Sequence, residues 1–207
     1  MLELKNIYKT FNPGTINEKV ALNGLNLTLN EGDFVTVIGG NGAGKSTMLN
    51  AVAGTWMVDE GQILIDGIDV TKLSEHKRAT YLGRVFQDPM TGTAATMGIE
   101  ENLALAKRRG KTRLLKPGIT KAERQEYKEL LKILGLGLED RLTSKVGLLS
   151  GGQRQALTLL MATLQKPKLL LLDEHTAALD PKTAAKVLEI TEMIVNRDHL
   201  TTMMITH

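Results

Sequence analysis

The sequence predicts an α/β fold with a mostly parallel sheet, and three observations predict it. Apolar runs too short for helices alternate with longer helical segments, as strands alternate with crossover helices. One apolar, β-branched run leads directly into a glycine-rich loop and then into a helix. With 207 residues, of which 42% are hydrophobic, the chain is also long enough to bury one substantial core.

Strands are expected where apolar and β-branched residues cluster between turn signals. The run Leu169–Leu172 is apolar throughout and too short for a helix, which is typical of a buried parallel strand. Asn23-Gly24 predicts a turn or bulge, and Asp66-Gly67 predicts a hairpin turn. The β segments are expected at Leu2–Tyr8, Val20–Leu29, Asp33–Ile38, Gln62–Val70, Ala79–Phe86, Leu169–Leu172 and Thr201–Thr206.

Helices are expected from capping residues and from helical spacing of apolar residues. Thr120 with Glu123 three residues later is a capping box, and Asp180 before Pro181 is an N-cap followed by a proline in the first turn. Residues 88–148 are mostly helical in pattern and are expected to form an inserted lobe. Helices are expected at Ser46–Ala53, Ile99–Lys107, Lys121–Leu134 and through Gln155–Leu164.

Composition excludes several classes of site. Cysteine is absent, so the chain has no disulfide framework, thiolate metal site or cysteine nucleophile. No apolar run approaches the roughly 20 residues that span a bilayer. The net charge of +3 does not by itself indicate nucleic acid. The basic run Lys107–Lys116 is interpreted as a solvated loop, with a contact to lipid headgroups or to a partner as the alternative.

Residues 39–46 match G-x-x-x-x-G-K-[ST] between an expected strand and an expected helix. The glycines let the backbone curl so that its N–H groups face phosphate oxygens, with the helix N-terminus behind them. Lys45 adds a charge for the β- and γ-phosphates, and the Ser46 hydroxyl is suited to ligate Mg²⁺. The expected phosphate-binding residues are Gly39, Gly40, Asn41, Gly42, Ala43, Gly44, Lys45, Ser46 and Thr47.

Two carboxylates follow the expected buried strand. Carboxylates at the carboxyl end of a parallel strand face the crevice where such sheets bind ligands. Asp173 is placed to hold Mg²⁺, and Glu174 is a candidate to polarise the attacking water in phosphoryl transfer. Without the preceding P-loop, a pair of acidic residues that caps the next helix would be the better interpretation.

The segment Leu149–Gln153 reads LSGGQ. Ser150 can cap the following helix, with Gln153 three residues later, and the glycines leave backbone N–H groups oriented toward an anion. LSGGQ is the signature of the ATP-binding-cassette (ABC) family, and the chain resembles that family over essentially its whole length. The resemblance implies that Ser150, Gly151, Gly152 and Gln153 contact ATP held by the P-loop of an opposite subunit.

The resemblance also implies roles for residues that carry no motif alone. Gln87 matches the glutamine that contacts Mg²⁺ or water, and Asp180 lies in the segment that matches the D-loop. His207 matches the switch histidine. Phe11 matches the aromatic residue that stacks on adenine, with Tyr8 as the second choice.

The fold implied by the resemblance is a P-loop NTPase core with an N-terminal antiparallel β subdomain and an inserted α-helical lobe. The core is expected at residues 1–87 and 149–207, and the lobe at about 88–148. Three departures stand out: His175 occupies a position that is usually proline, and Ala156 one that is often basic. The sequence ends at His207, where such domains normally continue, so a truncated C-terminal end is expected.

The implied function is ATP hydrolysis, with ATP and Mg²⁺ as cofactors, that powers solute transport. The implied partners are a second copy or a similar subunit, transmembrane permease subunits, and an extracellular or periplasmic solute receptor; the implied place is the cytoplasmic face of the membrane. The stretch Asp88–Leu105, which contains Thr96–Asn102, is similar to cassettes paired with receptors for amino-acid-like solutes.

Two alternatives compete with transport. A non-transport ABC ATPase acting on nucleic acid or the ribosome is disfavoured by the compact interval between Lys45 and Ser150, so no nucleic-acid partner is expected. A regulatory subunit with slow hydrolysis is disfavoured because Lys45, Asp173 and Glu174 are all present.

Overall fold

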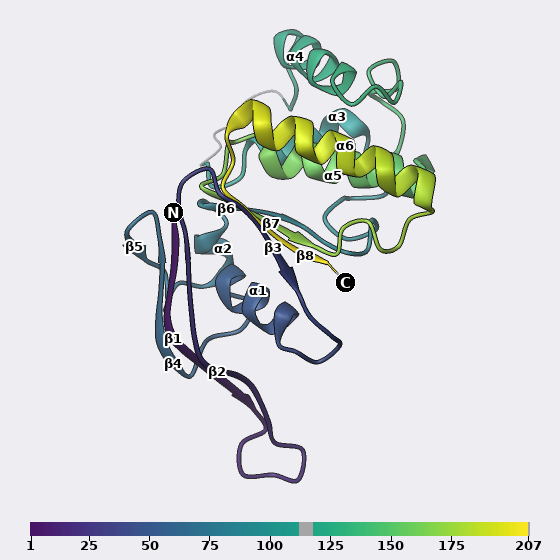
Figure 1. Cartoon of the computed structure of the whole chain (residues 1–207). Helices are drawn as coiled ribbons and strands as arrows, with labels where there is room; N and C mark the ends of the chain where they lie inside the picture. Colours follow the sequence, from purple (N-terminus) through teal and green to yellow (C-terminus); the bar gives the residue numbers. More distant parts are fainter. Residues whose placement is uncertain (112–117, 207) are drawn as a thin grey trace. The chain divides into compact units, whose positions relative to one another are not determined.

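The computed structural model describes residues 1–111 and 118–206, and it confirms the α/β fold (Figure 1). The strands are β1 Leu2–Phe11, β2 Lys19–Leu29, β3 Phe34–Ile38, β4 Glu60–Ile65, β5 Ile68–Asp69, β6 Leu82–Val85, β7 Leu169–Asp173 and β8 Thr202–Thr206. The helices are α1 Lys45–Ala53, α2 Glu75–Arg78, α3 Ile99–Lys107, α4 Lys121–Lys132, α5 Gly151–Thr163 and α6 Pro181–Asp198, with a 3-10 turn at Val146–Leu148. No helix in the described ranges is both long and apolar enough to cross a membrane.

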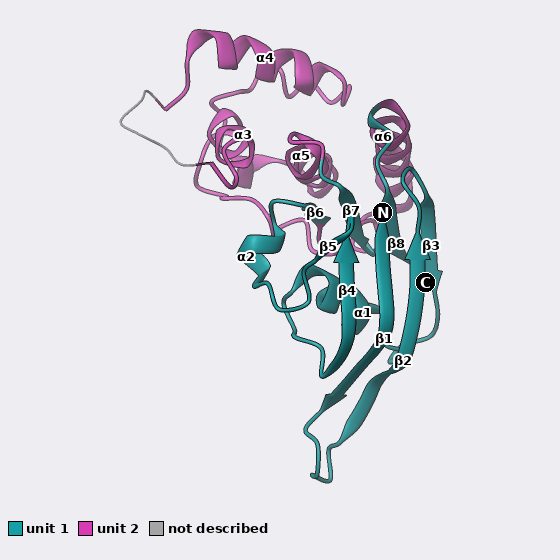
Figure 2. Ribbon diagram, turned by 90° about the vertical axis from the view of Figure 1, so that its left-hand side faces the viewer, with its two compact units in different colours: residues 1–84, 167–174, 198–207 teal, residues 85–166, 175–197 magenta. Residues whose placement is uncertain are grey.

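The chain divides into two compact units (Figure 2). The first unit contains both sheets, except for the last residue of β6, together with α1 and α2. The second contains α3 to α6 almost entirely. The first unit comprises Met1–Arg84, Pro167–Glu174 and Asp198–His207, and the second comprises Val85–Lys166 and His175–Arg197.

The antiparallel sheet has the strand order β2-β1-β4-β5 and confirms the expected N-terminal β subdomain. The pairing of β1 with β2 shifts register opposite Asn23-Gly24, and Gly24 has a φ of 67°, so the predicted bulge is present. Asp66 and Gly67 both have positive φ, as a tight hairpin of type I′ requires. Both turn predictions are therefore confirmed.

The second sheet has the order β3-β8-β7-β6, and β8 pairs in parallel with both β3 and β7. Residues Leu169–Leu172 of β7 are fully buried, as predicted for a strand covered on both faces. The expected strand Ala79–Phe86 is wrong in its first part. Helix α2 ends at Arg78, and the amide of Tyr81 donates to the carbonyl of Arg78, so a turn precedes β6.

Helix α1 lies in the core of the first unit. Its residues Met48, Leu49 and Val52 belong to the same buried cluster as side chains from both sheets, including Ile63 of β4 and Leu171 of β7. This burial fixes the helix that follows β3, and with it the loop that joins them. The first turn of α1, where the glycine-rich motif lies, is thereby held by the core.

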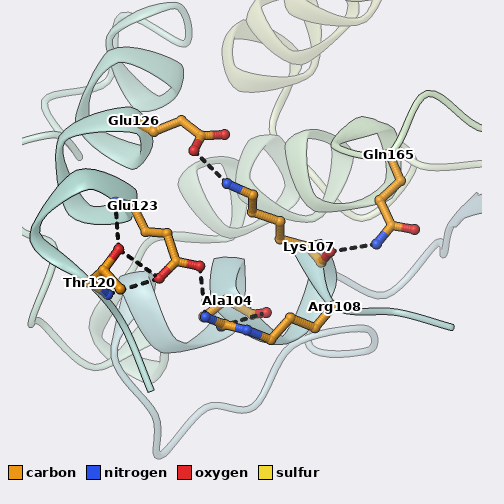
Figure 3. Close-up of polar contacts among 7 residues, drawn as sticks. All are labelled: Ala104, Lys107, Arg108, Thr120, Glu123, Glu126 and Gln165. Carbon is orange, nitrogen blue, oxygen red and sulfur yellow. Dashed lines mark hydrogen bonds and ion pairs between the residues drawn. The ribbon is translucent and has the colours of Figure 1, made fainter. Parts of the chain in front are cut away.

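In the second unit, polar contacts tie α3 to α4 (Figure 3). The amide of Glu123 donates to the Thr120 hydroxyl at 3.1 Å and the amide of Thr120 to a Glu123 carboxylate oxygen at 2.8 Å, so the predicted capping box is confirmed. Lys107 pairs with Glu126, and Arg108 with Glu123 at 2.7 Å. The first part of the basic run is thus held by carboxylates rather than only by solvent, contrary to the solvated-loop interpretation; residues 112–116 of that run lie outside the described residues.

Candidate active site

The loop between β3 and α1 requires glycine at two positions. Gly42 and Gly44 have φ values of 81° and 87°, in the left-handed region that glycine adopts without strain. A Cβ atom on Gly44 would lie 2.5 Å from the carbonyl oxygen of Ala21, where no side chain fits. These constraints bring the backbone of residues 39–44 around the N-terminus of α1, where unpaired N–H groups attract anions.

Lys45 directs its ammonium group back to this loop. The side chain is buried, and its Nζ donates to the carbonyl oxygens of Gly39 and Gly40, the second at 3.3 Å. An ammonium group has three N–H donors and no acceptor, so it is suited to exchange a carbonyl for a phosphate oxygen. The positive charge of Lys45 is thus already fixed beside the loop that would hold a phosphate.

A chain of polar contacts joins α1 to the end of β7. Ser46 and Asn50 are four residues apart and share one side of α1. The Asn50 amide oxygen accepts from Arg84 Nη2 at 2.8 Å, and the same nitrogen lies 3.1 Å from Asp173 Oδ2. Asp173 therefore faces the side of α1 that carries Ser46. Arg84 was not predicted as a site residue, because its contact with Asp173 spans 89 positions.

Glu174 follows β7 with a φ of 45°, a value uncommon for a residue with a side chain. Its amide still donates to the carbonyl of Ile205 at 3.1 Å, so the backbone remains in the ladder with β8. Such a conformation costs energy and persists where the surrounding structure holds it, here through the hydrogen bond of the Glu174 amide to β8. Backbone outliers of this kind cluster at active sites.

Phe11 ends β1 beside the single tryptophan of the chain. The rings of Phe11 and Trp56 meet edge to face with centroids 4.9 Å apart, and Lys9 Nζ lies 5.7 Å from the Phe11 centroid. The two contacts hold the Phe11 ring in one orientation. Tyr8 is 38% exposed rather than in the core, and its hydroxyl lies close to Gly24.

Ser150 caps α5, as predicted. The amide of Gln153 donates to Ser150 Oγ at 3.3 Å, and the amide of Ser150 to Gln153 Oε1 at 3.2 Å. Gly152 packs against α6 so closely that a Cβ atom would lie 2.0 Å from the Thr183 methyl group. Asp180 caps α6 by accepting from the amide of Thr183 at 3.1 Å, and its pKa is lowered by hydrogen bonds from the Thr183 side chain and backbone. The predicted N-cap at Asp180 is confirmed.

The N-terminal turns of α5 and α6 border one cavity of about 420 Å³. Two lysines contribute to its wall, and the exposed Ser150 lies at its edge. The cavity is lined by Ser150, Gln153, Lys182, Thr183, Lys186 and Ile190, among others. Helix N-termini and ammonium groups around one cavity make this surface suited to an anion.

Gln87 is exposed and follows directly on Phe86, whose position is set by α5. Gln155 is fully buried, and its Nε2 donates to the carbonyl of Phe86 at 2.9 Å. Arg154 is also buried and donates to the hydroxyl of Thr93 at 2.6 Å. The two residues after the LSGGQ segment thus anchor the segment that carries Gln87, a connection that sequence spacing does not reveal.

His175 is a buried structural residue. It is 1% exposed, and its Nε2 lies 3.1 Å from Thr191 Oγ1. Since the Thr191 hydroxyl donates its proton to the carbonyl of Val187, it accepts from His175, so the Nε2 atom of His175 carries a proton. Burial lowers the pKa of His175 from 6.5 to about 4. Ala156 is fully buried in α5.

The structure places the predicted site residues in two groups. The glycine-rich loop, Lys45, Ser46, Asp173, Glu174 and Phe11 belong to the first unit. Gln87, the segment Ser150–Gln153 and Asp180 belong to the second. His207 lies outside the described residues.

Comparisons with known proteins agree with this set of motifs. Residues 22–177 match the family described as ABC transporter. The chain is 45% identical to the tyrosine transport ATP-binding protein of Clostridioides difficile, and the match covers 100% of this chain and 82% of that protein. It is 38% identical to the methionine import ATP-binding protein MetN of Rhizobium johnstonii, with 90% of this chain and 50% of that protein covered, so it spans about half the length of that relative.

Solved structures give the same result for the fold. The dimeric ATP-binding cassette MJ0796, in a post-hydrolysis state bound to ADP and Pi, superposes with a TM-score of 0.82 at 33% identity. That match covers 100% of this chain and 88% of the cassette. A nucleotide-free cassette from an ABC transporter superposes with a TM-score of 0.78 at 28% identity, covering 100% of this chain and 81% of that one.

Proposed function

The chain belongs to the ABC transporter family and is one of its ATP-hydrolysing subunits, and on that premise we propose that it powers import of an amino-acid-like solute. The names of the tyrosine and methionine relatives support this class of solute. The observation that carries the ATP-driven part of the proposal is the LSGGQ segment, which forms the exposed, capped N-terminus of α5 in the same chain as a complete P-loop.

The first unit binds the nucleotide in this proposal. Phe11 stacks on adenine, and the backbone of residues 39–44 and Lys45 bind the phosphates. Ser46, Asp173 and Gln87 would hold Mg²⁺, which when bound neutralises charge on the phosphate oxygens. The residues fit such an ion: the exposed Ser46 hydroxyl and Asp173 Oδ1 make no hydrogen bond to any described residue, and both are the hard oxygen donors that Mg²⁺ prefers.

Hydrolysis requires a positioned water molecule, and we assign this task to Glu174. Its carboxylate leaves the sheet directly after Asp173, at the edge where the P-loop begins. The imposed φ of Glu174 fixes the direction in which the side chain starts. His207, which follows β8 in the sequence, is proposed to contact the γ-phosphate.

Two copies, or one copy and a similar subunit, are proposed to enclose the nucleotide between them. Ser150, Gly151, Gly152, Gln153 and Asp180 would then contact ATP bound by the partner's P-loop. The exposure of Ser150 and the anion-suited cavity beside it support this arrangement. The dimeric cassette with ADP and Pi is a precedent among similar structures.

The family also indicates the partners of transport. We propose that the catalytic core comprises residues 1–87 and 149–207 and that the lobe at about 88–148 receives a cytoplasmic segment of a membrane permease. The chain would work as a peripheral subunit at the cytoplasmic face of the membrane, with a solute receptor on the other side. No nucleic-acid partner is proposed.

Replacing Glu174 by Gln tests the catalytic part directly. The variant should bind ATP but hydrolyse it at least about a hundredfold more slowly, because a water-polarising group typically contributes this much. Glu31→Gln, at an exposed position in the turn before β3, is the matched control and should retain wild-type turnover. Turnover of Glu174→Gln within a few-fold of wild type would remove Glu174 from this role.

A further inference from the structure

Arg84 of β6 is the one guanidinium group that the described structure pairs with Asp173. We propose that Arg84 is the resident counter-charge of Asp173, which lets the site accept a nucleotide polyphosphate before Mg²⁺ arrives. This inference rests on the proposed function, because it assumes that Asp173 faces the nucleotide phosphates. It assigns to Arg84 a positioning and charge-balancing role rather than contact with the reacting atoms.

The guanidinium group is fixed from several sides. One terminal nitrogen, Nη2, donates to Asn50 Oδ1 at 2.8 Å and to Asp173 Oδ2 at 3.1 Å, while Nη1 donates to the Thr55 hydroxyl at 3.3 Å. Asn50 lies in α1 and Thr55 just after it, so the anchors come from the helix that begins in the P-loop. A planar group held by such directional contacts has little freedom to move away from the carboxylate.

Burial strengthens the electrostatic effect of this pair. The side chains of Arg84 and Asp173 are only 14% and 17% exposed, so solvent and salt screen them less than a surface pair. Without Arg84, the Asp173 carboxylate would present a full negative charge to a polyphosphate. With Arg84 present, the net charge of the Arg84–Asp173 pair is zero.

The contact need not break when the metal site fills. A carboxylate has two oxygens, and Arg84 contacts only Oδ2. Oδ1 makes no hydrogen bond or ion pair to the described part of the chain and remains available to a cation. Arg84 should therefore matter most when Mg²⁺ is absent, because a divalent cation neutralises the same carboxylate and the phosphates together.

The test measures the affinity for ADP by isothermal titration calorimetry, in EDTA and in saturating Mg²⁺. ADP is used because it has no γ-phosphate that the protein could hydrolyse during the titration. Arg84→Gln should weaken binding in EDTA by on the order of tenfold, as expected for one partly screened charge near a polyanion, and by less than about threefold in Mg²⁺. Arg84→Lys, which keeps the charge, should stay near wild type. Lys5→Gln removes a charge from the exposed Lys5–Glu3 pair on β1 and serves as the control.

Combination with Asp173→Asn gives an ordered expectation. In EDTA the affinity for ADP should follow the net charge of the Arg84–Asp173 pair. Asp173→Asn should bind ADP most tightly and Arg84→Gln most weakly. The wild type and the double variant Arg84→Gln/Asp173→Asn, whose pairs are both neutral, should bind it equally. Circular dichroism and thermal unfolding check that each variant folds. If Arg84→Gln alone does not fold, the weaker binding of the double variant than of Asp173→Asn in EDTA isolates the Arg84 charge and carries the test.

Two failures are distinguishable. If wild-type protein binds ADP but Arg84→Gln has the same ratio of EDTA to Mg²⁺ affinities, or Asp173→Asn does not bind more tightly in EDTA, the role of Arg84 is refuted. If wild-type protein binds no nucleotide in either buffer, the proposed function itself fails.

Discussion

Acidification should destabilise this protein through His175. The imidazole is buried and neutral, and burial lowers its pKa from 6.5 to about 4. Between those pH values the unfolded chain binds a proton that the folded chain does not. The stability that His175 contributes by staying neutral is therefore present above about pH 6.5 and is lost as the pH falls toward 4.

The size of the effect follows from the two pKa values. A shift from 6.5 to about 4 corresponds to a limiting loss of about 3 kcal/mol in the free energy of unfolding, of which about 2 kcal/mol is already lost at pH 5 relative to pH 7. Losses of this size are a large fraction of the stability of an ordinary domain.

The assay is urea unfolding at pH 7, 6, 5 and 4.5 for the wild type and for His175→Gln. Glutamine keeps an N–H donor for Thr191 and does not titrate, so this variant should lose about 2 kcal/mol less than the wild type between pH 7 and pH 5. His76→Gln, at an exposed position of α2, should follow the wild type. If His175→Gln loses as much stability as the wild type, the burial argument is wrong.

Two further substitutions test contacts described above. Gly152→Ala should lower the free energy of unfolding by about 1–3 kcal/mol, because the new methyl group collides with Thr183. Adding Thr183→Ser, which removes the colliding methyl group, should restore most of this stability in urea unfolding. An unrescued double variant would contradict the contact. Phe11→Ala should weaken ATP binding on the order of tenfold through lost stacking, yet leave tripolyphosphate binding unchanged in calorimetry. Tyr8→Ala should leave both affinities unchanged, and the reverse result would move the adenine contact to Tyr8.

Local chemistry explains why much of the fold was predictable. The capping pairs at Thr120 and Ser150 are three residues apart, and the hairpin at Asp66-Gly67 depends on two adjacent residues. Signals of this kind are complete within one stretch of sequence. The buried strand Leu169–Leu172 was equally clear, because a short run that is apolar on both faces is typical of a strand covered on both sides.

Contacts between distant segments explain what was missed. Helix α2 has four residues, and the fully buried Arg78 that ends it donates to carbonyls of Ala51 and Val52 in α1. A basic residue before an apolar run gives no local sign of such a contact. The same holds for Arg84 with Asp173 and for Gln155 with the carbonyl of Phe86, which pack residues far apart in the sequence around the candidate site.

In the proposed cycle, ATP closes two copies of the chain around composite sites, and hydrolysis opens them. The most direct measurement is the molar mass of Glu174→Gln by size exclusion with light scattering, with and without ATP. We expect a monomer without nucleotide and a dimer with ATP, because the closed state forms and is not emptied by hydrolysis. A Glu174→Gln protein that binds ATP yet stays monomeric at every protein concentration would rule out ATP-driven dimerisation.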